Sequence, residues 1–173
     1  MKPIIIVFIK TYIAYFISFS IFWAIVPLDF DISFLDIFRR AFICSFMSSF
    51  FMIYILKNKL KKKGIIEFTK KNLSVVQSEK FETALTIQEI IEKLRESASV
   101  FRMKMILSGN TIFLKKKMNW KTWGDKIKIS INESDTDKRI IHLISRPKYL
   151  FTVMDFGRNL ENVELFKSIL ETK

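Results

Sequence analysis

Two apolar segments at the start of the chain run directly into a cluster of lysines. Residues 3–28 contain a single charged residue, Lys10, and residues 41–56 contain none. A largely uncharged apolar stretch of about 18 or more residues is long enough to cross a bilayer as a helix. The second segment has only 16 residues, so it crosses with tilt, local thinning or snorkelling of flanking cations. The sequence therefore predicts a transmembrane helical hairpin.

The charges around the two segments predict which side of the membrane each end faces. Residues 57–63 carry five lysines, and the loop between the segments carries Asp29, Asp31 and Asp36. Lysine and arginine accumulate on the cytoplasmic side of a membrane, although Arg39 and Arg40 in the loop favour the opposite orientation. We expect a membrane protein with both termini in the cytoplasm, which for a bacterial chain is the inner membrane. The simplest role of the lysine run is to stop transfer and to contact anionic lipids.

Length and charge predict one basic domain after the hairpin. We expect residues 1–63 to form the hairpin with its lysine run, and residues 64–173 to form a single small domain. Of the net charge of +12, residues 57–173 contribute +11. A basic surface attracts polyanions: anionic lipid headgroups, RNA or DNA, or a small phosphorylated ligand. Charge alone does not choose among these partners.

The periodicity of the second part predicts an α+β fold. Thr86 and Glu89 form a capping box before a helix over 87–97. From residue 100 the period changes from helical to two, which indicates strands. One face of the first strand is predicted to hold Phe101, Met103, Met105 and Leu107, and Ser108-Gly109-Asn110 supplies a tight turn that makes a β-hairpin with the next strand. The predicted strands are 101–107, 111–115, 126–132 and 139–145, with short candidates at 65–68 and 73–76. A last helix follows, with Asn159 as its N-cap. We predict a small, mainly antiparallel sheet with two packed helices.

The sequence offers few catalytic groups. His142 is the only histidine, and its alternation with Ile140 and Ile144 favours a packed or interfacial side chain. Cys44 lies in the second apolar segment, so no nucleophile and base can be paired. Asp135 and Asp137 lack the glycine and the distal glutamate of a calcium loop. We therefore expect no enzymatic activity, no metal and no cofactor.

Cations stand beside aromatic residues in one predicted loop. Aromatic rings can stack nucleobases while neighbouring cations hold phosphates. An alternative is that the tryptophans cover the core or lie at the bilayer surface, with the lysines at the headgroups. The candidate ligand-binding residues in this loop are Lys116, Lys117, Trp120, Lys121 and Trp123.

Further cations surround the last strand and the start of the last helix. Backbone N–H groups at a helix start can receive a phosphate, although a solvated rim is the alternative. The candidate ligand-binding residues here are Arg146, Lys148, Arg158 and Asn159. Arg102 and Lys104 on one strand, with Lys126 and Lys128 on another, predict a basic surface on the sheet.

The C-terminal segment resembles the end of an uncharacterised domain family of bacteria and plastids. The resemblance is carried by Ser145-Arg146-Pro147 and by Asp155-Phe156-Gly157-Arg158-Asn159, followed by an amphipathic helix. It implies no function.

The whole layout resembles the small two-span membrane effectors of type III CRISPR systems. The shared features are a short hairpin, the lysine run 57–63 and one basic α+β domain without a catalytic set. The resemblance implies a homo-oligomer, such as a tetramer, whose basic domain binds a cyclic oligoadenylate such as cyclic tetra-adenylate. Binding would be passed to the membrane spans in antiviral defence. The alternative is a membrane-anchored immunity or assembly protein with no nucleotide ligand.

Overall fold

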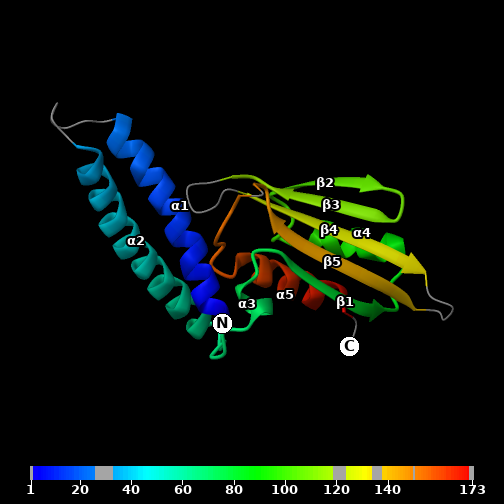
Figure 1. Ribbon diagram of the computed structural model, residues 1–173. Helices are drawn as coiled ribbons and strands as arrows, with labels where there is room; N and C mark the ends of the chain where they lie inside the picture. The colour runs from blue at the N-terminus through cyan, green and yellow to red at the C-terminus, as the bar shows by residue number, and fades with distance from the viewer. Residues whose placement is uncertain (1, 26–32, 119–123, 134–137, 150, 172–173) are drawn as a thin grey trace. The chain divides into compact units, whose positions relative to one another are not determined.

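The chain forms two compact units, Met1–Leu73 and Ser74–Lys173. The structure, a computed structural model, describes residues 2–25, 33–118, 124–133, 138–149 and 151–171. Figure 1 shows long helices in the first unit and a sheet with helices in the second.

Two long apolar helices make up most of the first unit. α1 spans Pro3–Ile25, α2 spans Phe34–Lys62 and the short α3 spans Lys70–Leu73. By length and composition α1 and α2 could each cross a membrane, so the predicted pair of apolar helices is confirmed. α2 is longer than the predicted 16-residue span, because its 29 residues start after the N-cap Ser33 and continue into the lysine run. Lysine favours a helix, and the first glycine after α2 is Gly64.

α1 and α2 pack against each other as an antiparallel pair. Three edge-to-face ring pairs, with centroids 5.3–5.8 Å apart, join Phe8 to Phe46, Tyr12 to Phe42 and Phe16 to Phe38. The residue numbers rise along α1 as they fall along α2, so the two helices run in opposite directions. Small side chains buried on α2 allow the backbones to approach: Ala41, Ser45 and Ser49.

The second unit is an antiparallel sheet with helices, which confirms the predicted α+β class. The strands are β1 (Gln77–Thr83), β2 (Met103–Ser108), β3 (Thr111–Lys116), β4 (Asp125–Glu133) and β5 (Arg139–Pro147), in the order β1-β5-β4-β3-β2. The helices are α4 (Ile87–Glu96) and α5 (Arg158–Leu170). Figure 1 shows α4 and α5 on one face of the sheet. Among the described residues of this unit no helix covers the other face, which we call the open face.

Several predicted elements of this unit are present. The Thr86 side chain accepts a hydrogen bond from the Glu89 backbone, and the Glu89 side chain accepts one from the Thr86 backbone, so the capping box begins α4. A turn at Gly109 joins β2 and β3 in the predicted hairpin. The strands predicted at 126–132 and 139–145 are β4 and β5.

The strands predicted at 65–68 and 73–76 are wrong. Neither segment contains a strand residue, and the first strand is β1. Gln77 and Thr83, both polar, are buried in β1, and the Thr83 hydroxyl donates to the Leu170 carbonyl at 2.8 Å. β1 therefore lacks the apolar alternation from which a strand is recognised.

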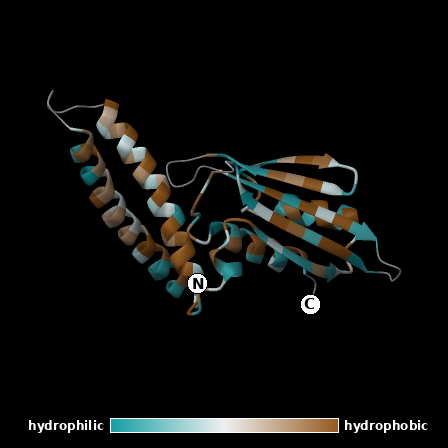
Figure 2. Ribbon diagram, viewed as in Figure 1, coloured by the Kyte–Doolittle hydropathy of each residue, from teal (hydrophilic) through white to brown (hydrophobic). Residues whose placement is uncertain are grey.

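The hydrophobic core lies between the sheet and the two helices. Figure 2 shows hydrophobic and hydrophilic residues alternating along the strands. Strand side chains with almost no exposed surface form the floor of this core: Ile112, Leu114, Ile127, Ile129, Ile131, Ile141 and Leu143. α4 adds Ile90 and Leu94, and α5 adds Phe166 and Leu170.

The first strand of the predicted β-hairpin buries only some of the side chains that were expected to face the core. Met103 and Met105 pack against the core as predicted. Phe101 and Leu107, which were predicted to share that face, are 85% and 45% exposed. Phe101 precedes β2, and Leu107 lies close to the turn.

Candidate functional site

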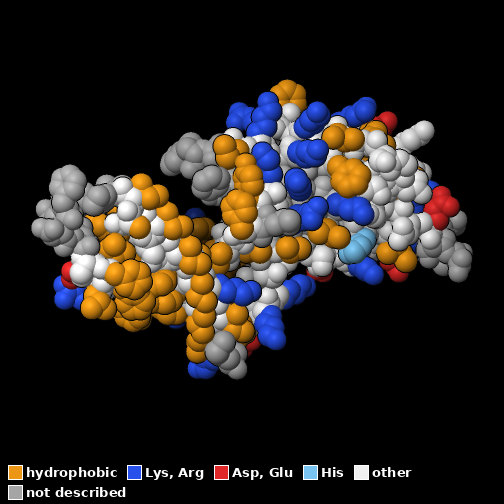
Figure 3. All heavy atoms as spheres, turned by 45° about the horizontal axis from the view of Figure 1, so that its top comes forward, with side chains coloured by type: hydrophobic (Ala, Val, Ile, Leu, Met, Phe, Trp, Pro, Cys, Tyr) orange, Lys and Arg blue, Asp and Glu red, His pale blue; other side chains and the backbone are white. Residues whose placement is uncertain are grey.

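Four cations lie in register across the open face. Lys104 of β2 is opposite Lys115 of β3, Lys115 is opposite Lys126 of β4, and Lys126 is opposite Arg146 of β5. Neighbouring strands are about 4.8 Å apart, so this cation row extends over about 14 Å. Figure 3 shows lysine and arginine side chains gathered on the second unit, with hydrophobic side chains among them.

The cation row is unfavourable for the stability of the sheet. Like charges directly opposite each other on neighbouring strands are destabilising. The open-face positions of β2 to β5 contain no aspartate or glutamate that could neutralise the row. The positive potential is therefore available to an anion from solution.

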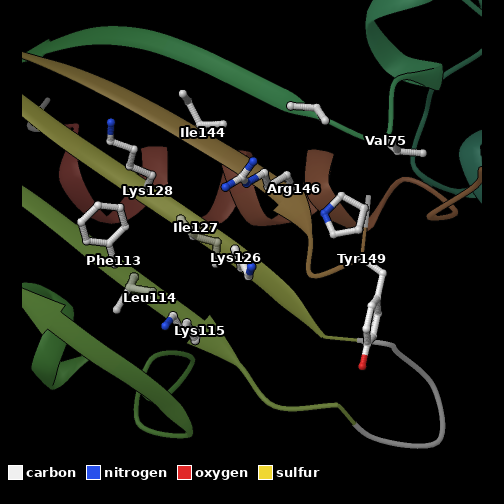
Figure 4. Close-up of a pocket in the computed structure, with 12 residues that line it drawn as sticks. Val75, Phe113, Leu114, Lys115, Lys126, Ile127, Lys128, Ile144, Arg146 and Tyr149 are labelled. Carbon is white, nitrogen blue, oxygen red and sulfur yellow. The ribbon is translucent and has the colours of Figure 1, made fainter. Parts of the chain in front are cut away.

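A groove of about 390 Å³ follows the cation row on the open face. Figure 4 shows Lys115, Lys126 and Arg146 in its lining, with Phe113 and Lys128 on the same strands as the two lysines. Ile144 and Tyr149 add apolar and aromatic surface. The groove therefore combines several cations with rings and aliphatic side chains, which is the combination that holds phosphates and bases together.

Tyr149 is part of an aromatic cluster after β5. The Lys148 ammonium nitrogen lies 5.2 Å from the centre of the Tyr149 ring, and the Tyr149 and Phe151 ring centroids are 5.5 Å apart. Phe151 is 81% exposed. Lys148, one of the predicted ligand-binding residues, is thus next to a groove-lining ring.

The loop candidates lie only partly within the described residues. Lys116 ends β3 opposite Met103, one position beyond Lys115, and Lys117 is an exposed residue just after the strand. Trp120, Lys121 and Trp123 lie outside the described residues. Of the cations predicted for the basic surface, Lys104, Lys126 and Lys128 share the open face, whereas Arg102 precedes β2.

Arg158 and Asn159 are on the helix-covered side, away from the cation row. The Arg158 guanidinium lies 3.5 Å from the Asp125 carboxylate. Asn159 is fully buried. The prediction that Asn159 is the N-cap of the last helix is wrong, because α5 begins at Arg158 and its N-cap is Gly157. The backbone N–H groups of Gly157 and Asn159, which were candidates either to receive a phosphate or to be solvated, both donate to the Asp155 carboxylate, at 3.0 and 2.9 Å. Asp155 therefore occupies the place of the expected anion.

A chain of buried hydrogen bonds joins β5 to α5. The Ser145 hydroxyl donates to the Asn159 amide oxygen at 2.6 Å, and the Asn159 amide nitrogen donates to Asp155 and to the Val75 carbonyl. The Asn162 amide donates to the Ser145 hydroxyl at 3.1 Å and to Asp125 at 3.3 Å. Burial raises the pKa of the Asp155 carboxyl, and the hydrogen bonds from Asn159 and Gly157 oppose that rise.

This chain of bonds explains the spacing of the C-terminal motif. Ser145 points toward α5 and is buried, and because side chains alternate along a strand, Arg146 points to the open face. Asp155, Gly157 and Asn159 supply the other half of the contact between β5 and α5. The motif fixes α5 beneath the sheet and at the same time presents one cation to the groove.

Sequence reasoning did not find Lys115, Phe113, Ile144 and Tyr149 as members of one site. The alternation in β3, β4 and β5 was the available signal, but it does not give the register between strands. Known families do not help to interpret the groove, because no family model matches the chain and no curated protein matches it either. Within the described ranges, no three His, Cys, Asp or Glu side chains are grouped as metal ligands.

Proposed function

We propose that the chain is a membrane-anchored effector whose basic domain binds a cyclic oligoadenylate and transmits binding to its membrane helices. The observation that carries this proposal is the cation row beside the aromatic and aliphatic lining of the groove. Its destabilising repulsion is relieved when phosphates neutralise it. Adenine rings can stack on the aromatic surface formed by the half-buried Tyr149 and the exposed Phe151.

The size of the groove supports an assembly of several copies. A volume of about 390 Å³ is at the low end of small-molecule sites. One groove therefore accommodates part of a cyclic tetra-adenylate, and symmetric copies would surround the remainder. We propose a homo-oligomer, such as a tetramer, as the functional form.

The first unit would hold the protein in the bacterial inner membrane. α1 and α2 have the length and composition of membrane spans, and the lysines at the end of α2 favour the cytoplasmic side. Both termini would then be cytoplasmic, and the lysines would contact anionic lipids. The antiviral role rests on the resemblance in layout to the CRISPR effectors.

A second candidate function is an immunity or assembly protein without a nucleotide ligand. Exposed apolar residues, such as Ile106 on the open face and Phe151 after β5, would favour contact of the second unit with an anionic bilayer. Titration of the full-length protein in detergent with labelled cyclic tetra-adenylate distinguishes the two. A fluorescence polarisation of the labelled ligand that rises to saturation, with an affinity that weakens as salt is added, supports the first function. An unchanged polarisation favours the second.

A further inference from the structure

β2 is an edge strand with unused backbone groups. It pairs only with β3 in the described sheet. The turn between Ser108 and Thr111 has two residues, so Ser108, Ile106 and Lys104 exchange hydrogen bonds with β3. The backbone groups of Met105 and Leu107 consequently point outward, and the N–H of Met103 donates to the Val100 carbonyl at 2.7 Å.

The two edges of the sheet are protected differently. β1 carries Glu79, Lys80 and Glu82, and two of these are in ion pairs, Glu79 with Lys167 and Glu82 with Lys138. Charged side chains of this kind discourage pairing with another chain. β2 carries one charge, Lys104, and is otherwise composed of Met103, Met105, Ile106, Leu107 and Ser108.

We propose that two copies of this chain pair through their β2 strands, antiparallel, with Ile106 on the two-fold axis. Met105 of each copy then exchanges two backbone hydrogen bonds with Leu107 of the partner subunit, because these are the residues whose groups point outward. The two sheets would become one continuous ten-stranded sheet.

The side chains of β2 fit this register. Ile106, 37% exposed on the open face, meets the partner's Ile106, and Lys104 faces the partner's Ser108, so no like charges are opposed. On the other face, a hollow of about 290 Å³ is lined by five apolar side chains, Met105, Leu107, Val100, Phe101 and Met103, and by Arg95. Leu107 of the partner subunit lies over Met105 beside this hollow, which would remove exposed apolar surface from water.

The pairing has a consequence for the ligand, which rests on the proposed function. A two-fold axis perpendicular to the sheet puts both open faces on the same side. The two cation rows would then share one surface, a two-fold arrangement that fits a symmetric cyclic ligand. The pairing itself depends only on the edge, and two copies anchored in one membrane meet at a raised effective concentration.

Disulfide trapping of the full-length protein tests the register. In a Cys44→Ser background, Ile106→Cys places two thiols at a non-hydrogen-bonded pair with Cα atoms about 4.5 Å apart, which suits a disulfide. Lys104→Cys is the matched control, since its two Cα atoms would be about 14 Å apart. We expect a reducible covalent dimer after mild oxidation with Ile106→Cys and none with Lys104→Cys.

A backbone variant then distinguishes cross-linking through paired β2 edges from cross-linking by random encounters of two molecules. Leu107→Pro removes an outward N–H that β3 does not use, so the sheet should keep its melting temperature while the Ile106→Cys cross-link is lost. If Leu107→Pro melts earlier, Leu107→Lys keeps every backbone bond and places a charge on the edge. The pairing would be overturned if both cysteine variants cross-linked equally or if Ile106→Cys gave no cross-link. It would also be overturned if the Ile106→Cys cross-link persisted in the Leu107→Pro and Leu107→Lys variants. A trapped dimer that binds no cyclic oligoadenylate would instead contradict the proposed function.

Discussion

Lys126 and Arg146 are direct cross-strand partners on the open face of the sheet, and Lys115 flanks Lys126 on its other side. Lys126 therefore has a like charge opposite it on both neighbouring strands. Sheets that are selected for stability alone pair opposite charges or neutral side chains at such positions. Binding of an anion would account for this arrangement. Removing a charge from the cation row should then weaken anion binding while it stabilises the sheet.

Lys126→Gln should stabilise the domain and weaken ligand binding. Removing the central charge relieves two repulsions, worth about 0.2–1 kcal/mol at low salt, so the melting temperature by circular dichroism should rise. Lys128→Gln is the matched control, because its cross-strand partners are Phe113 and Ile144, and its melting temperature should change less. A lower melting temperature for Lys126→Gln would contradict the repulsion.

Asn159→Ala should destabilise the domain. The substitution leaves the Ser145 hydroxyl without its acceptor and the Val75 carbonyl without its donor. Unsatisfied buried groups cost about 1–3 kcal/mol each. Urea unfolding followed by circular dichroism measures the loss, and the exposed Asn132→Ala should change stability by less than about 0.5 kcal/mol. If Asn159→Ala unfolds like the native protein but loses affinity for cyclic tetra-adenylate, Asn159 is a ligand-binding residue after all.

Gly124→Ala should distort the end of the groove. Gly124 has φ +87°, and an added Cβ would lie 2.8 Å from the Lys116 carbonyl oxygen. A left-handed conformation costs a residue with a Cβ about 1–2 kcal/mol, and the clash adds to this. Gly109→Ala, at φ +54° with open space around the Cβ, should lower the melting temperature less. Equal shifts for the two variants would exclude a close backbone approach at Gly124.

The hairpin should place residue 30 outside the cytoplasm and residue 64 inside it. The lysines at the end of α2 carry this expectation. Alkaline phosphatase fused after residue 30 should be active, and the same enzyme fused after residue 64 inactive, with green fluorescent protein giving the reverse. Cytoplasmic signal at both positions would rule out the proposed hairpin topology.

The sequence predicts the elements whose signals are local. Thr86 and Glu89 identify the start of α4, and Ile127, Ile129 and Ile131 show the inward face of β4. β1 escaped prediction because its inward Gln77 and Thr83 are satisfied by hydrogen bonds to distant or turn residues rather than by apolar contact.

The site required information that is not local. Lys104, Lys115, Lys126 and Arg146 are separated by 11 to 20 residues along the chain, and their alignment depends on the register of three strand pairs. At the start of α5, the backbone N–H groups of Gly157 and Asn159 already donate to the Asp155 carboxylate, so a phosphate there would have to displace that carboxylate. A buried carboxylate in a turn and a solvated one look the same in a sequence.

Calorimetric titration of the full-length protein in detergent, at low salt, with cyclic tri-, tetra- and hexa-adenylate measures ligand binding to the basic domain. We expect heat with cyclic tetra-adenylate and an affinity that falls as salt rises. Arg146→Ala should weaken the affinity about tenfold or more, since a charge-assisted hydrogen bond contributes about 1.5–3 kcal/mol. No heat with any of the three, from protein shown to be folded by circular dichroism, would contradict the proposed function.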